Sequence, residues 1–151
     1  MVDLRPFLKG IVVILGIGNI LKSDDGAGPY LINKLKKARL RSNLELLDAG
    51  TAPENFTGKI KQLSPNTLIM VDAADFCGKA GEVRVIEEEK LGSVGFTTHN
   101  LPLKDLIRFL RVEIPELRVV LIGIQPKKVE FGEELSPEVK SAIDKLCMNF
   151  I

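Results

Sequence analysis

Four polar residues in this sequence are of the types that bind metals or move protons. They are the carboxylates of Asp24, Asp25 and Asp72 and the only imidazole of the chain, His99. Two carboxylates and one imidazole make a donor set that suits a divalent ion of intermediate softness, such as Ni²⁺, Zn²⁺, Fe²⁺ or Co²⁺. Because three protein ligands leave positions open for water or a substrate atom, such a set is typical of a working metal centre.

Each of these residues also has a simpler interpretation. One of Asp24 and Asp25 can cap the helix that follows, while the other favours the helix dipole. Asp72 can be a hydrogen-bond acceptor in a loop, with Asp75 as its solvated neighbour. A lone histidine is more often a satisfied polar residue than a ligand. The polar sequence around His99, directly before an expected helix, nevertheless favours the interpretation that His99 is a metal ligand.

Strands that alternate with helices must position these side chains. Apolar runs predict buried strands over residues 11–15, 44–47, 67–71 and 117–124, and an alternating pattern predicts a half-exposed edge strand over 82–87. Residues 53–63 are expected to form a short helix or loop, and residues 91–98 a loop with two glycines.

Three segments have the apolar spacing of amphipathic helices. Their inner faces are predicted to contain Ala27, Leu31, Leu35 and Ala38 in the first helix, Leu103, Leu106, Ile107 and Leu110 in the second, and Val139, Ala142, Ile143 and Leu146 in the third. Ser136 before a proline is expected to cap the third helix.

This order of elements predicts an α/β fold in a single domain over residues 1–151. We expect a three-layer sandwich, with a mostly parallel, twisted sheet of about five strands and helices on both faces. Ligands of such sheets bind beyond the carboxyl ends of the strands. The rule selects residues 18–25, 48–55 and 72–75, together with the loop around His99.

Composition excludes several classes of function. A formal net charge of +1 in 151 residues leaves no broad basic field, so nucleic acid is not an expected partner. No secretory leader or apolar run long enough to cross a bilayer is seen, which predicts a cytoplasmic protein without a membrane segment. Cys77 and Cys147 lack ligand spacing and are expected to be buried or inert. The oligomeric state is left open.

Other enzyme classes fit the residues poorly. Gly16 and Gly18 begin a dinucleotide-binding pattern, but Leu21 occupies the position of its third glycine. Asp24 and Asp25 would also place negative charge where a pyrophosphate needs positive potential. No second histidine is present to act as the base of a serine or cysteine triad, and no HExxH motif occurs.

Six blocks of sequence carry a resemblance to a known family. They are GIGNIL at residues 16–21, DDGAG at 24–28, DAGTAPEN at 48–55, VDA at 71–73, TTHNLPL at 97–103 and GIQP at 123–126. In this order they resemble the nickel–iron hydrogenase maturation endopeptidases, most of all the branch that matures formate-hydrogenlyase-type hydrogenases. Separate blocks in register are far more specific than one glycine motif.

The resemblance implies a three-layer α/β endopeptidase. Its partner would be the precursor of a hydrogenase large subunit, from which it removes a short C-terminal extension after nickel insertion. The metal-contacting positions of the family carry over to Asp25, Asp72 and His99, and the family often has glutamate at the first of these. The nickel is expected to be presented by the precursor, so the isolated protein can be metal-free.

Further residues are expected to contact or position the precursor rather than to perform chemistry. They are Gly18, Asn19, Glu54, Asn55, Thr98 and Asn100. The residues do not decide whether Asp25 or Asp72 acts as the general base. Two rival functions remain: a nickel-sensing chaperone that only holds the precursor, and another metal-dependent hydrolase of the same fold.

Overall fold

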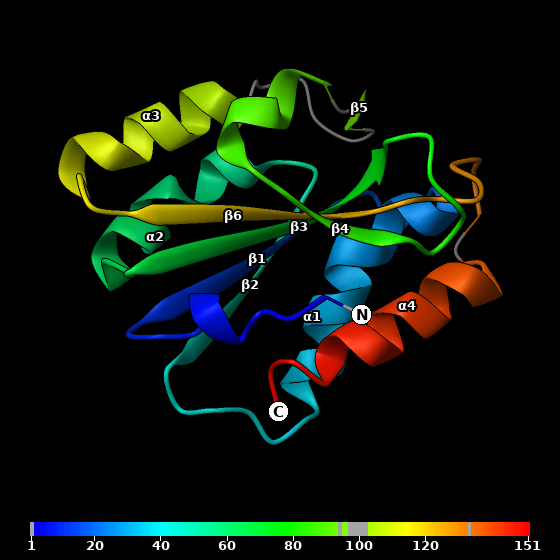
Figure 1. Cartoon of the computed structure of the whole chain (residues 1–151), viewed down its shortest axis with the longest axis horizontal. Coiled ribbons are helices and arrows are strands. Elements are labelled where there is room, and N and C mark those ends of the chain that lie inside the picture. The colour runs from blue at the N-terminus through cyan, green and yellow to red at the C-terminus, as the bar shows by residue number, and fades with distance from the viewer. Residues whose placement is uncertain (1, 94, 97–102, 133) are drawn as a thin grey trace.

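The computed structural model of this chain describes residues 2–93, 95–96, 103–132 and 134–151. In these residues one sheet lies between two layers of helices (Figure 1). No helix in the described ranges is both long and apolar enough to cross a bilayer.

Six strands in the described part of the chain form the sheet. The main path runs in the order β2 (Leu44–Gly50), β1 (Val12–Ile17), β3 (Thr67–Asp75), β6 (Arg118–Ile124) and β4 (Val83–Ile86). The first four of these are parallel, whereas β4 pairs antiparallel with β6. Strand β4 lies at an edge of the sheet, as the alternating pattern predicts. A short strand, β5 (Gly95–Phe96), pairs antiparallel with the end of β3. The expected α/β fold with a mostly parallel sheet is confirmed.

Helices cover both faces of this sheet and enclose two apolar cores. The elements are α1 (Ala27–Lys36) and α4 (Pro137–Cys147) on one face, and α2 (Thr57–Leu63) and α3 (Leu103–Glu113) on the other. Strand β1 contributes to both cores, because alternate side chains of a strand point to opposite faces. Val12 and Ile14 pack toward α1 and α4, while Val13 and Leu15 pack toward α2 and α3.

Short 3₁₀ helices connect these elements. They are η1 (Arg5–Phe7), η2 (Ser23–Gly26), η3 (Pro53–Phe56) and η4 (Glu88–Ser93). The segment expected to be a short helix or loop is therefore η3 followed by α2. The loop expected over residues 91–98 is wrong in its described part, where η4 ends and β5 forms.

Two further boundaries differ from the sequence prediction. Helix α1 ends at Lys36, so Ala38 follows the helix in a turn and does not extend its inner face. Strand β3 continues to Asp75, so Asp72 lies within the strand and not after it. The reason is that β6 pairs with β3 as far as Ala73 and β5 pairs with its last two residues, although β1 pairs only to Val71.

Gly28 sets the distance between α1 and the sheet. An ideal Cβ at this position would lie 2.3 Å from the Ile17 carbonyl oxygen and 2.5 Å from the Val71 carbonyl oxygen. Since both contacts are with strand backbone, a larger residue can be accommodated only if the helix moves away from β1 and β3.

We expect Gly28→Ala to lower the free energy of unfolding by about 1–3 kcal/mol, because the added methyl meets backbone that cannot rotate away. Gly58→Ala is the matched control. It places the same methyl in α2, where nothing lies within 4 Å, and should be neutral or stabilising by up to about 1 kcal/mol. Urea unfolding of both variants measures the difference. Equal stabilities would show that the helix approach is not constrained.

Candidate functional site

Two of the predicted site carboxylates lie at the same edge of the sheet. Asp25 is part of η2, between β1 and α1, and is 1% exposed. Asp72 is on β3, one residue beyond the last pair with β1, and is also 1% exposed. Element η2 contacts β3 directly. The topology therefore brings two buried carboxylates, 47 positions apart in the sequence, to the carboxyl edge.

Three predicted site residues, Thr98, His99 and Asn100, lie outside the described residues. Whether the imidazole joins the two carboxylates thus stays a prediction. Among the residues that the structure describes, no group of three histidine, cysteine, aspartate or glutamate side chains could hold a metal. The carboxylates alone offer oxygen donors, which suit harder ions better than nickel or zinc.

Gly18 determines how the loop after β1 reaches Asp25. Its φ angle is +151°, and an ideal Cβ would lie 2.1 Å from the Asp25 carbonyl oxygen. Its N–H donates to the carbonyl of Gly50, at the end of β2, over 2.8 Å. Only glycine permits this approach, so the loop after β1 is held against both η2 and the end of β2.

The remaining loop residues of the prediction take different places. The Asn19 Oδ1 atom accepts a hydrogen bond from the Leu21 N–H over 2.9 Å, so this side chain shapes the turn. Glu54 and Asn55 are exposed on η3, directly after β2. These two side chains are therefore accessible to a protein partner.

Asp24 has a role that differs from the helix-cap interpretation. No side chain caps α1 or η2. The Asp24 carboxylate is instead completely buried and reaches across the chain. Its Oδ2 atom accepts from the N–H groups of Lys127 and Lys128 over 2.8 and 3.1 Å. The N–H and hydroxyl of Ser136 donate to Oδ1 and Oδ2 over 2.7 and 2.9 Å.

These bonds join the loop that carries Asp25 to the segment between β6 and α4. The Asp24 N–H also donates to the Lys128 carbonyl over 3.2 Å, and the Ser23 N–H donates to the Gly132 carbonyl. Ser136 serves both sides, because its hydroxyl oxygen accepts from the Val139 N–H and caps α4 as predicted. In Figure 1 the orange segment after β6 runs beside the blue segment before α1.

Gln125 is a structural residue that sequence reasoning missed, although it stands in the GIQP block. Its buried side chain accepts from the N–H groups of Phe76 and Gly78 and donates to Asp75 over 3.2 Å. A hydrogen bond from the Cys77 N–H, with the Gln125 amide, lowers the pKa of the exposed Asp75 carboxyl. The polar glutamine after an apolar strand was the available signal.

The two cysteines only partly match their prediction. Cys147 is buried in α4, and burial raises the pKa of its thiol. Cys77 is exposed in the turn after β3.

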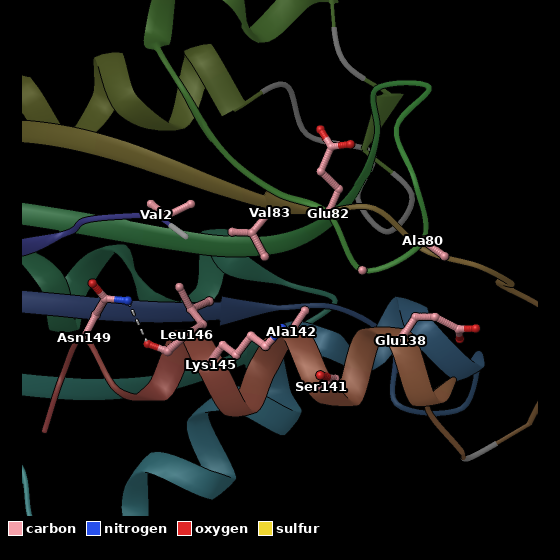
Figure 2. Close-up of a pocket in the computed structure, with 11 residues that line it drawn as sticks. Val2, Ala80, Glu82, Val83, Glu138, Ser141, Ala142, Lys145, Leu146 and Asn149 are labelled. Carbon is pink, nitrogen blue, oxygen red and sulfur yellow. Dashed lines mark hydrogen bonds between the residues drawn. The ribbon is translucent and has the colours of Figure 1, made fainter.

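A cavity of about 690 Å³ lies between β4 and α4, and neither Asp25 nor Asp72 lines it. Figure 2 shows Val83 of the strand facing Ala142 and Leu146 of the helix across it, while Glu82 and Glu138 point away from its centre. None of the residues predicted to carry the chemistry lines this cavity. The candidate site therefore remains at the carboxyl edge near Asp25 and Asp72.

We expect Asp24→Asn to lower the free energy of unfolding by about 3–5 kcal/mol, because the amide replaces an acceptor oxygen with a donor in a buried network. Backbone amides of Lys127 and Lys128 should also lose protection against hydrogen exchange. Asp105→Asn, on the exposed face of α3, is the control and should cost about 1 kcal/mol or less. Unchanged stability and exchange in the Asp24 variant would contradict the role of its carboxylate.

Comparisons with known proteins agree with this architecture. A family model described as hydrogenase maturation protease matches residues 29–151. Hydrogenase 3 maturation protease of Escherichia coli K12 is 39% identical over 133 residues, which are 87% of this chain and 83% of that protein.

Solved structures give the same result. One similar structure is the crystal structure of the nickel–iron hydrogenase maturation protease HycI from Thermococcus kodakarensis KOD1. The two chains are 31% identical with a TM-score of 0.85, and the match covers 96% of this chain and 94% of the HycI chain. Another is the solution structure of the endopeptidase HycI from Escherichia coli, with a TM-score of 0.80 and 37% identity. This match covers 91% of this chain and 87% of the Escherichia coli chain. With the family model and the relative above, these matches show that the chain belongs to the hydrogenase maturation protease family.

Proposed function

We propose that this protein is the endopeptidase that removes the C-terminal extension from the precursor of a nickel–iron hydrogenase large subunit after nickel insertion. Asp25, Asp72 and His99 would contact the nickel that the precursor presents. The observation that carries the proposal is the burial of two carboxylates at one sheet edge, in a member of this protease family. The cytoplasmic location expected from the sequence belongs to the same proposal.

The described residues around His99 support its place in the set. Phe96 pairs with Ala74, two residues along β3 from Asp72. His99 follows Phe96 by three residues, and three residues of chain reach at most about 11 Å. On the other side of His99, Leu103 begins α3 and is buried in the core under the same edge. The length of chain from Phe96 thus allows the imidazole to reach the carboxylates, as the proposal requires.

The chemistry of the proposed set follows from its donors. A metal next to the scissile peptide polarises the carbonyl and lowers the pKa of a bound water to about 7. Asp25 and Asp72 would both contact this centre, and one of the two carboxylates would also take the proton from the attacking water. The imidazole supplies the nitrogen that favours nickel over magnesium or calcium.

We expect His99→Ala, Asp25→Asn and Asp72→Asn each to lose cleavage of the nickel-loaded precursor almost completely, by at least about a hundredfold, since each removes one ligand. Asp75→Asn is the control, because asparagine keeps the oxygen that accepts from the Cys77 N–H. Cleavage assays and thermal melts are run on all four variants. A His99→Ala protein that melts normally and still cleaves the precursor would refute the metal contact.

The same assay separates the rival functions. The proposed endopeptidase cleaves the nickel-loaded precursor and leaves the nickel-free form intact. A chaperone binds the precursor without cleaving either form, and an unrelated hydrolase of this fold cleaves without regard to nickel. Either of these results overturns the proposal.

Glu54 and Asn55 would bind the precursor without taking part in the chemistry, because both are exposed beside the site. We expect Glu54→Ala to raise KM for the precursor severalfold and to leave kcat within about twofold, the pattern of lost uniform binding. Glu45→Ala, exposed near the opposite end of β2, is the control. A fall in kcat at unchanged KM would move Glu54 into the catalytic set.

A further inference from the structure

Large apolar side chains are exposed on two segments beside the candidate site. Ile20 and Leu21 are 58% and 52% exposed, and Val129 and Phe131 are 41% and 83% exposed. We call these four residues the apolar rim. They come from the loop before η2 and from the segment after β6. Apolar groups gathered on a protein surface mark sites of protein interaction more often than scattered ones do.

Hydrogen bonds hold the two segments of the rim together. The Gly132 N–H donates to the Leu21 carbonyl over 2.9 Å, and Lys22 forms an isolated parallel bridge with Gly132. The Ser23 hydroxyl donates to the Glu130 carbonyl over 3.1 Å, and the Lys22 ammonium lies 5.4 Å from the centroid of the Phe131 ring. Since its backbone is already fixed, the rim can bind a partner without ordering a loop first.

The rim is continuous with the residues that carry the proposed chemistry. Gly26, the residue after Asp25, packs so closely on the loop that a Cβ there would lie 2.9 Å from the Ile20 Cα. Leu21 precedes Asp25 by four residues, a length of chain that reaches at most about 14 Å. A polypeptide bound at Asp25 therefore passes beside the rim.

A groove next to the rim completes the surface. Its volume is about 310 Å³, and its walls include Ile20, Leu21, the Tyr30 ring and Leu135. The groove lies between the loop before η2 and α1, so an apolar side chain of a partner can enter it while neighbouring groups cover the rim.

From these observations we propose that the apolar rim and its groove bind an apolar segment of the precursor polypeptide next to the cleaved bond. This inference rests on the proposed function, because it takes the precursor as the partner of the site. The rim supplies binding energy away from the reacting atoms, and that energy places the scissile bond at Asp25 and Asp72.

The test compares two double variants of the full chain on the nickel-loaded precursor. Leu21→Ser/Phe131→Ser removes two rim residues that are mostly exposed, so little folding energy is lost. Val112→Ser/Met148→Ser is the control. It removes two exposed apolar residues at the C-terminal ends of α3 and α4, where Val112 is 75% and Met148 66% exposed. We expect the rim variant to raise KM at least tenfold with kcat within about twofold, and the control to match the wild type.

The outcomes separate the two proposals. If the wild type does not cleave the nickel-loaded precursor, the proposed function fails. If the wild type cleaves and the rim variant has an unchanged KM, the docking inference fails while the function stands. Sedimentation tests the other occupant: a wild-type dimer that the rim substitutions dissociate without raising KM makes the rim an interface between copies and overturns the inference. Phe131→Ser alone, at the most exposed rim position, repeats the test if the double variant melts early.

Discussion

A carboxylate buried away from water must be compensated by hydrogen-bond donors, and the placement of the site depends on how Asp24 meets this requirement. Removing a charged group from water costs several kcal/mol unless donors replace the lost hydration. The backbone N–H groups of Lys127, Lys128 and Ser136 and the Ser136 hydroxyl do so here. Because all these donors lie more than 100 residues along the chain, their bonds tie η2 to the start of α4.

This link gives the neighbouring aspartates separate tasks. Asp24 faces the segment after β6 and fixes the backbone, and Asp25 is thereby held at the carboxyl edge near β3. Gly18 adds a second constraint, because its lack of a side chain lets the loop after β1 approach the Asp25 carbonyl. Because the loop is fixed from both sides, the Asp25 carboxylate and the apolar side chain of Leu21, four residues earlier, keep the same positions relative to each other. Preorganisation of this kind lowers the entropic cost of binding a large substrate.

Most of the fold could be predicted from local patterns. The four parallel strands, the edge strand β4, the capped helix α4 and the two-faced packing all follow from apolar periodicity and from Ser136. The end of β3 could not be predicted in this way, because the residues after Val71 stay in the strand only through pairing with β5 and β6. Asp25 and Asp72 were correctly expected at one edge. The partners of Asp24 and Gln125 could not be found, since most of them are backbone N–H groups far away in the sequence, which leave no mark in sequence spacing.

The bond between Asp24 and Ser136 also bears on how the protein is made. During synthesis the ribosome releases the chain from its N-terminus, and domains fold as their segments emerge. The loop before α1 emerges well before its donors, which belong to residues 127, 128 and 136. A nascent chain that has not reached residue 127 lacks all the bonds that Asp24 accepts, and one that has not reached Ser136 lacks two of the four. Orientation of the carboxyl-edge loop is thus tied to synthesis of the segment up to Ser136, which withholds a formed site from chains that stop short of it.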